Sequence, residues 1–358
     1  MRPLLTRRVF VRSLAGAAAS PWVACRAQVG EDREERVVDP GLGLDEQVLC
    51  QSFLTPVEDF YRQFGAKSTV DGWQQPDLSA DATIAIDGLV AQPLSLRLED
   101  LEADQDAHVT VLNTLMCIFG PRSTAIFTGI PLRVLLARAG IDRTRARRLR
   151  LYGADGFENN LRVSDVFDNP PDLFEPLLAF RIAGEPLPKT LGYPVRLLLN
   201  DRYGYKNVKW LARIEATDDD RPSGQYQMRG YPDAGVIEPV PVVETHRVTQ
   251  TIPVGATQLC GFALSGYAPI EVVELSLDGG PPEQLEGSPL EALIREHPGL
   301  SETRQVAEPA RFGFPLRGVW VRWQYVFDAR PGEHRIEVRT RDGAGNLGEA
   351  TALRLIAG

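Results

Sequence analysis

A cysteine stands at the end of an apolar, strand-like run that covers residues 109–116. Cys117 follows this run directly, and Gly120 and Pro121 then break the strand pattern. A thiolate delivered at the end of a buried strand is a suitable ligand for a soft metal. The alternative is a structural cysteine, because cysteine is among the most frequently buried residue types. This stretch alone leaves both interpretations open.

Other residue types that often do chemistry form no recognisable motif. None of the four histidines lies in a nucleophile motif with a serine or a cysteine, so a hydrolase finds little support. The sequence also has no C-x-x-C-H motif for haem attachment. Any electrons that a metal centre exchanges must therefore come from, or go to, a separate redox protein.

The first 27 residues have the composition of an export signal. Arg7 and Arg8 precede a short Ala-rich stretch, and the pair resembles a twin-arginine signal, the class that exports folded proteins. We expect cleavage near Ala27, since Cys25 lies in a poor lipidation motif. Export of a folded chain to the periplasm favours a cofactor inserted beforehand. Losing the five arginines of this segment takes the formal net charge from −9 to −14, which argues against nucleic acid or an anionic membrane as partner.

Three cysteines follow the predicted signal: Cys50, Cys117 and Cys260. An exported protein could oxidise a pair of them, but their spacing resembles neither a disulfide framework nor a zinc site. Because their number is odd, at least one thiol is free or otherwise occupied.

Strands and short helices alternate up to about residue 235. We expect strands at 83–90, 109–116, 149–153, 160–167, 177–188, 193–199 and 208–216, and helices that begin near 96 and 131. The basic run 143–150 is interpreted as a solvated face. Without a regular βαβ period or a G-x-G-x-x-G turn, this pattern predicts a mixed α+β domain and not a Rossmann fold.

From about residue 240 the segments become strand-like and are separated by Gly, Pro and Asp turns. They predict an all-β, immunoglobulin-like sandwich with a role in packing or dimerisation. The predicted organisation is a signal (1–27), a polar arm (28–45), a catalytic domain (46–235) and the sandwich (236–358).

Several motifs occur together in one order along the chain. They are Cys117 at its strand end, Phe127–Leu132, Gly184–Pro188, Leu191–Arg196 and Tyr205–Trp210. In this order and spacing they resemble the sulfite oxidase family of molybdopterin enzymes. The resemblance covers roughly residue 45 to the end and includes the family's sandwich-type dimerisation domain.

The resemblance implies that Cys117 ligates a molybdenum held by one pyranopterin dithiolene, the molybdenum–molybdopterin cofactor. Arg229 and Arg122 are candidates for a substrate-facing cation, and Phe157 aligns with the family's active-site tyrosine. Taken singly, each basic residue could also be an ordinary surface charge. The implied cofactor-binding residues are Arg62, Phe64, Arg196, Tyr205, Lys206 and Lys209.

The sequence departs from the family pattern around the expected site. Residues 118–121 replace a Gly-Asn pair and arginines, Phe157 replaces the tyrosine, and Phe64 and Leu191 replace histidines. We therefore expect a more apolar pocket that holds a neutral or larger substrate better than sulfite.

The leading hypothesis is an exported molybdenum oxidoreductase that transfers an oxygen atom to or from a small, sulfur-containing substrate and exchanges electrons with a carrier such as a c-type cytochrome. The sandwich domain, with a possible homodimer, favours sulfite oxidation, whereas the missing tyrosine favours reduction of a sulfoxide. A non-catalytic scaffold or binding relative is the alternative of a different class.

Overall fold

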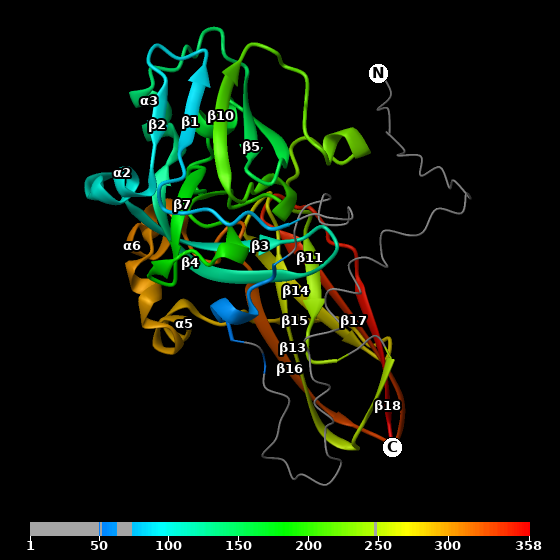
Figure 1. Ribbon diagram of the computed structural model, residues 1–358. Coiled ribbons are helices and arrows are strands. Elements are labelled where there is room, and N and C mark those ends of the chain that lie inside the picture. Colours follow the sequence, from blue (N-terminus) through cyan, green and yellow to red (C-terminus); the bar gives the residue numbers. More distant parts are fainter. Residues whose placement is uncertain (1–49, 51, 63–73, 247–248) are drawn as a thin grey trace, which may run out of the picture. The chain divides into compact units, whose positions relative to one another are not determined.

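The computed structural model describes residues 50, 52–62, 74–246 and 249–358 (Figure 1). Contacts divide the chain into two units, Met1–Gly41 and Leu42–Gly358, and every described residue belongs to the second. The predicted signal, the predicted polar arm and Phe64 lie outside the described residues. In the part of the chain that is described, no helix is long and apolar enough to cross a membrane.

A five-stranded sheet carries one side of the pocket described below. Its order is β2 (Leu94–Leu96), β1 (Ile84–Gly88), β10 (Leu211–Thr217), β5 (Arg148–Gly153) and β6 (Glu158–Arg162). Only β1 and β10 run parallel. Apolar side chains at alternate positions of β1 and β10 are buried, and they share one core with α2 (Leu98–Ala103), α3 (Leu132–Arg138) and α4 (Ser164–Phe167).

A second, antiparallel sheet carries the predicted cysteine strand. Its order is β3 (Val109–Met116), β4 (Arg122–Pro131), β7 (Leu177–Ile182) and β8 (Glu185–Pro186), and β9 (Arg196–Leu198) also pairs with β7. The last six residues of β3 are buried, Asn113 and Thr114 among them, so both faces of this strand are covered. Since Met116 pairs with Arg122, Cys117 begins the loop that joins β3 to β4.

The C-terminal part contains two further sheets. One has the order β11 (Val240–Val243), β13 (Gly255–Leu264), β16 (Val321–Ala329), and the other β12 (Thr249–Ile252), β18 (Thr351–Ala357), β17 (Gly332–Asp342), β14 (Ile270–Leu277), β15 (Glu283–Leu285). Leu259 and Trp323 of the first sheet share one buried cluster with Val273, Ile336 and Leu355 of the second. The two sheets therefore enclose a single apolar core.

The prediction that residues 236–358 are all β was wrong for one segment. Between β15 and β16 the chain forms α5 (Leu290–Glu296), α6 (Arg304–Ala307) and α7 (Pro309–Phe312). The amide of Gln305 in α6 accepts from Leu112 N at 3.1 Å and donates to Leu112 O at 2.7 Å. These helices form because their apolar residues, Leu293 among them, are buried in the same cluster as Leu112 of β3. The C-terminal part thus contributes to the core beneath the cysteine strand.

Short 3-10 turns complete the described secondary structure. They are η1 (Val57–Asp59), η3 (Gln105–Ala107), η4 (Lys189–Leu191), η5 (Gly204–Lys206), η6 (Gln227–Arg229) and η7 (Pro298–Glu302). Three of them, η4, η5 and η6, lie in the segments that build the pocket described below.

Two further expectations need correction. The basic run 143–150 is not simply a solvated face, because Arg148 is buried and its Nη1 lies 2.8 Å from Asp233 Oδ2. Cys50 and Cys260 form a disulfide with their Cα atoms 5.5 Å apart, although their separation of 210 residues gave no sign of it. Cys117 is the cysteine outside this bond among the described residues.

Candidate active site

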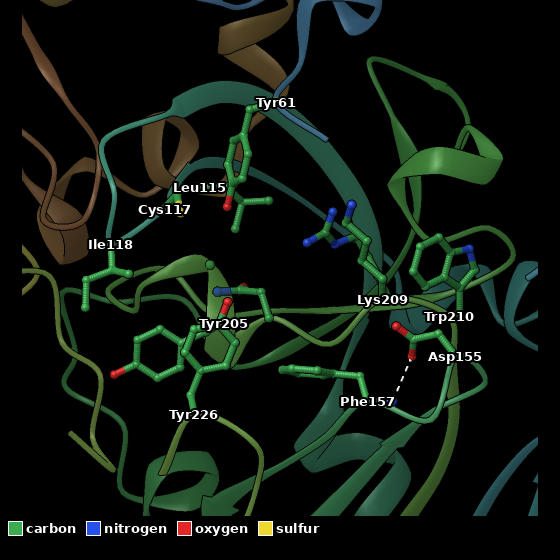
Figure 2. Close-up of a pocket in the computed structure, with 13 residues that line it drawn as sticks. Tyr61, Leu115, Cys117, Ile118, Asp155, Phe157, Tyr205, Lys209, Trp210 and Tyr226 are labelled. Carbon is green, nitrogen blue, oxygen red and sulfur yellow. Dashed lines mark hydrogen bonds between the residues drawn. The ribbon is translucent and has the colours of Figure 1, made fainter. Parts of the chain in front are cut away.

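Loops from the sheet that contains β5 and β6 and from the sheet that contains β3 and β4 meet around one pocket (Figure 2). It brings together five of the predicted site residues, Cys117, Phe157, Arg196, Tyr205 and Lys209. The other described residues that line it are Tyr61, Leu115, Ile118, Asp155, Gly204, Asn207, Trp210 and Tyr226.

Cys117 is held in the β3–β4 loop by the backbone. Its N–H donates to Pro121 O at 2.7 Å, and its carbonyl accepts from Gly120 N at 3.0 Å. Phe119 N lies 3.5 Å from Cys117 Sγ, a contact that suits a thiolate. The side chain is buried. Cys117 therefore follows the strand end directly and lines the pocket.

Arg196, the first residue of β9, and Lys209, which follows η5, form a cationic side of the pocket, and both donate to carbonyls of η4. Arg196 Nη1 donates to Leu191 O at 3.0 Å, and Lys209 Nζ donates to Thr190 O at 3.0 Å. Gly192, at φ 110°, lies between them, since a Cβ there would be 3.1 Å from Arg196 Cβ and 3.2 Å from Lys209 Cβ. Only glycine lets the turn pass this closely beneath both side chains.

Burial disfavours the positive charge of both side chains. Burial lowers the pKa of Arg196 to about 10. Burial, and then the positive charge of Arg196, hold the pKa of Lys209 well below its usual value. Arg196 Nε is buried and has no hydrogen-bond partner among the described residues. An anionic group placed between these two cations would satisfy this N–H and relieve the repulsion.

Aromatic rings form another wall. Phe157 enters from the β5–β6 hairpin, where its N–H donates to Asp155 Oδ1 at 3.0 Å in a tight turn. Tyr205 and Tyr226 stack with their ring centroids 4.8 Å apart and their planes 13° apart. Phe157 meets Tyr226 edge-on at 6.2 Å. The Tyr205 phenol donates to Pro232 O at 2.8 Å, which fixes its ring, and burial raises its pKa.

Tyr61 reaches the pocket from the segment that precedes the first sheet. Its N–H donates to Ser123 Oγ at 3.0 Å. Its phenol oxygen lies so close to Gly204 that a Cβ at that position would clash with it. With Tyr61, Tyr205 and Tyr226, the lining has three phenols. The lining therefore includes phenols, although Phe157 stands where the family's tyrosine is expected.

Arg122, a predicted substrate-facing cation, is directed elsewhere. It forms an ion pair with Glu244 of the C-terminal part, and both side chains are largely buried. Its guanidinium also lies 5.9 Å from the ring centroids of Phe262 and Trp320. Burial lowers the pKa of Arg122 to about 10. It does not line the pocket.

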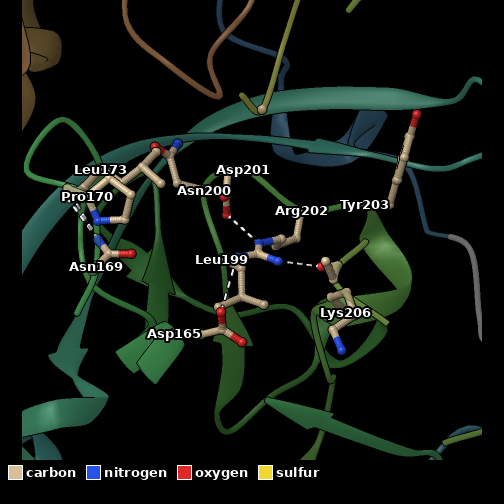
Figure 3. A network of polar contacts seen from close by, with 12 residues as sticks. Asp165, Asn169, Pro170, Leu173, Leu199, Asn200, Asp201, Arg202, Tyr203 and Lys206 are labelled. Carbon is tan, nitrogen blue, oxygen red and sulfur yellow. Dashed lines mark hydrogen bonds and ion pairs between the residues drawn. The ribbon is translucent and has the colours of Figure 1, made fainter. Parts of the chain in front are cut away.

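Three other predicted residues are not part of the lining. Arg229 is exposed at the end of η6, and Arg62 is exposed with Nη2 donating to a backbone carbonyl of η1. Lys206 is buried beside Arg202 in a polar network (Figure 3). Its Nζ donates to Asn160 O at 2.6 Å and lies 3.8 Å from Asp233 Oδ1. Of these three residues, Arg62 still influences the pocket, because its positive charge helps to lower the pKa of Lys209.

Sequence reasoning missed Tyr61, Asp155, Trp210 and Tyr226 as lining residues. Each is one to three positions from a residue that it did select, and this proximity along the chain was the available signal. Which neighbour faces the pocket depends on turn conformation. Trp210, at φ 48°, is an example that periodicity does not reveal.

Comparisons with known proteins identify the family. Residues 73–225 match the oxidoreductase molybdopterin binding domain. Over 282 residues the chain is 26% identical to human mitochondrial sulfite oxidase, and this match covers 65% of the chain and 49% of that protein. The chain belongs to the sulfite oxidase family of molybdopterin-dependent oxidoreductases.

Other relatives match shorter stretches of the chain. A nitrate reductase [NADPH] of Phytophthora infestans is 29% identical over 171 residues, which are 41% of the chain and 19% of that protein. The uncharacterized oxidoreductase YuiH of Bacillus subtilis is 29% identical over 150 residues, which are 40% of the chain and 72% of that protein. The chain thus spans about half of the sulfite oxidases and less of the nitrate reductases that it matches.

The solved structure of the sulfane dehydrogenase SoxCD from Paracoccus pantotrophus has the same fold. It matches 95% of the chain and 86% of its own chain, with a TM-score of 0.64 and 20% sequence identity. The likeness extends to the C-terminal part, because its coverage exceeds the molybdopterin domain.

The residues of the pocket fit the cofactor of this family. A molybdopterin carries a phosphate, and the orphaned Nε of Arg196 beside Lys209 is a site for an anion. A soft metal needs a thiolate, and Cys117 lines the same pocket.

Proposed function

We propose that the chain is an exported molybdenum-cofactor oxidoreductase that transfers an oxygen atom to or from a small sulfur substrate. The observation that supports this most directly is the meeting of Cys117 with Arg196 and Lys209 in one pocket. A thiol and two desolvated cations match the two ends of a molybdopterin: the metal and the phosphate.

In this proposal Cys117 ligates the metal, and Arg196 and Lys209 hold the phosphate. The bound cofactor supplies the oxygen-atom and two-electron chemistry. Tyr61 and Tyr205 line the same pocket and would help to hold the cofactor there; the phenol of Tyr61 lies directly against Gly204 of η5. The aromatic wall excludes water from the reacting atoms, which strengthens the electrostatic interactions there.

The Cys50–Cys260 disulfide supports the proposed export, because disulfides persist in oxidising compartments such as the bacterial periplasm. The paired Arg7 and Arg8 agree with a folded, cofactor-loaded substrate of the twin-arginine pathway. We further propose that a c-type cytochrome or a similar carrier exchanges the electrons. We also propose that the C-terminal sheets form an immunoglobulin-like sandwich and that two chains form a homodimer through it.

Metal and pterin analysis of the exported protein tests this function. We expect about one molybdenum and one molybdopterin per chain, because Cys117, Arg196 and Lys209 of the described residues line one pocket together. Cys117→Ser should lose most of the metal, and Arg196→Gln should lose pterin. Arg229→Gln is the matched control, because this arginine is exposed and outside the pocket. A folded wild-type protein without molybdenum would refute the enzyme and leave the scaffold alternative.

A further inference from the structure

We propose that residues 52–62 form a strap that closes one side of the cofactor pocket, and that the Cys50–Cys260 disulfide holds this strap in place once the cofactor has been inserted. The inference rests on the proposed function and adds a redox-controlled step to it. Oxidation of the two thiols then retains a cofactor that enters the pocket while they are reduced.

The strap begins on the C-terminal part of the chain. Cys50, which precedes it, is bonded to Cys260 of β13, 210 residues away in the sequence. Phe53 of the strap is buried, and its carbonyl accepts from Trp320 Nε1 at 3.1 Å. The disulfide is therefore a covalent tether at the beginning of the strap.

The strap then crosses β4 and ends in the pocket. Thr55 N donates to Thr124 O at 2.8 Å, and Tyr61 N donates to Ser123 Oγ at 3.0 Å. The side chain of Tyr61 lines the same pocket as Cys117 (Figure 2). The tether and the pocket residue thus belong to one short segment.

Tyr61 connects two sides of the pocket. Its backbone is held on β4, whereas its phenol oxygen lies directly against Gly204 of η5. The next residue, Arg62, brings a positive charge that helps to lower the pKa of Lys209. When the strap moves away, the phenol and this charge leave the surroundings of a bound cofactor together. A closed strap therefore hinders both entry and release of the cofactor on this side.

The strap is a segment that can open while the sheets stay folded. As far as the structure describes it, its regular structure is the three-residue turn η1, and it belongs to none of the sheets. Phe53 and Phe60 are buried in the cluster that includes Leu112 of β3, so the closed position is favoured. Segments without a hydrogen-bonded ladder open at a lower free energy than the sheets they cover, and a crosslink at one end restricts the open states.

The disulfide forms where the chain meets an oxidant. Thiols stay reduced in the cytoplasm, and disulfides persist in oxidising compartments. The proposed export of a folded chain places cofactor insertion before this change. After export, the two thiols exchange with the disulfide of an oxidising carrier protein, so that the Cys50–Cys260 bond forms and the carrier's S–S bond breaks. Two electrons and two protons pass to the carrier, which leaves as a dithiol.

Release of molybdopterin from the loaded protein tests the strap. Free pterin is followed by the fluorescence of its oxidised product, with and without tris(carboxyethyl)phosphine. We expect reduction of the wild type to speed release by about tenfold or more, as the loss of a crosslink at the strap allows. Cys50→Ser with Cys260→Ser should release at the fast rate in both buffers, which separates the disulfide from any other effect of the reductant.

Leu355→Ala is the matched control for overall stability. Leu355 is buried in the core between the two C-terminal sheets, whereas Phe53 and Phe60 of the strap belong to another cluster. This variant destabilises the fold and should keep the slow release of the oxidised wild type. Fast release from Leu355→Ala, or equal release from oxidised and reduced wild type, would overturn the strap and leave the proposed function intact. Wild-type protein that never contains molybdopterin would overturn both.

Hydrogen exchange supplies a readout that needs no turnover. In peptides that cover the strap, the protection of the Thr55 and Tyr61 amides should fall by about tenfold or more when the disulfide is reduced. Peptides from β10 should keep their protection. Protection of the strap that does not change on reduction would refute the proposal.

Uptake tests the opposite direction. Cofactor-free protein, oxidised or reduced, is mixed with molybdate and with molybdopterin freshly released from a donor molybdenum protein. The reduced form is expected to take up pterin faster than the oxidised form, and the serine double variant should match the reduced form. Equal uptake by the oxidised and reduced wild type would show that the strap does not control entry and would contradict the proposed order of insertion and oxidation.

Discussion

The ion pair between Arg122 and Glu244 decides whether Arg122 serves structure or substrate. The side chains are only 14% and 9% exposed, and Arg122 Nε and Glu244 Oε2 are buried without hydrogen-bond partners among the described residues. Removing one partner of a buried pair leaves the other charge uncompensated, at a cost of about 3–5 kcal/mol. We therefore expect Arg122→Leu, and separately Glu244→Leu, to lower the free energy of unfolding by this amount.

The double variant is expected to behave differently. Arg122→Leu with Glu244→Leu removes both charges and both orphaned atoms, and it places apolar groups next to Phe262 and Trp320. Such replacements are often neutral or stabilising by about 1–4 kcal/mol. We therefore expect the double variant to recover most of the free energy of unfolding that each single variant loses.

Urea unfolding, followed by near-ultraviolet circular dichroism, measures this cycle on the same protein preparations used for kinetics. The KM for substrate should be unchanged in the double variant, because Arg122 does not line the pocket. Two results together would refute the reasoning: a single variant Arg122→Leu that loses less than about 1 kcal/mol, and a raised KM in every variant without the guanidinium.

Three further outcomes are expected. Cys50→Ser with Cys260→Ser should lower the free energy of unfolding by about 2–5 kcal/mol, with equal stability of the variant in oxidising and reducing buffer as the check. Gly204→Ala should displace the Tyr61 phenol, because the added Cβ would lie 2.1 Å from its oxygen, and metal analysis should show reduced molybdenum retention. Burial lowers the pKa of Lys206 to about 8, so the unfolded chain binds this proton more tightly than the folded chain does. The free energy of unfolding, measured with urea, should therefore rise from pH 8 to 9.5, and the rise should be smaller in Lys206→Met.

The parts of the fold that the sequence predicted are those with strong local patterns. The apolar run before Cys117 became β3, and the helix expected from residue 131 became α3, followed by Gly140 at φ 66°. The helices α5 to α7 were missed because their apolar spacing is short and lies between strands. Their burial against β3 depends on a contact nearly 200 residues away in the sequence, and no local pattern encodes that contact.

The candidate site was also predictable where sequence motifs mark it, and not where turn conformation decides which side chain faces the pocket. Cys117, Arg196 and Lys209 were found because family motifs mark their positions. Lys206 and Lys209 are only three residues apart, yet their amines donate to Asn160 O and Thr190 O in different segments. Motif membership could not separate a buried structural lysine from a pocket lysine. The conformation of η5 and of the residues after it makes that separation.

The molybdopterin domain defined by its family match does not form this pocket by itself. That match begins at residue 73, yet Tyr61 lies before it, in a segment fixed by Trp320 Nε1 donating to Phe53 O at 3.1 Å and by the Cys50–Cys260 disulfide. The C-terminal part therefore positions an N-terminal pocket residue. It also supports β3 through the paired hydrogen bonds to Leu112. Because these contacts reach both the strand before Cys117 and the segment that carries Tyr61, the C-terminal sheets and helices form a structural component of the candidate site.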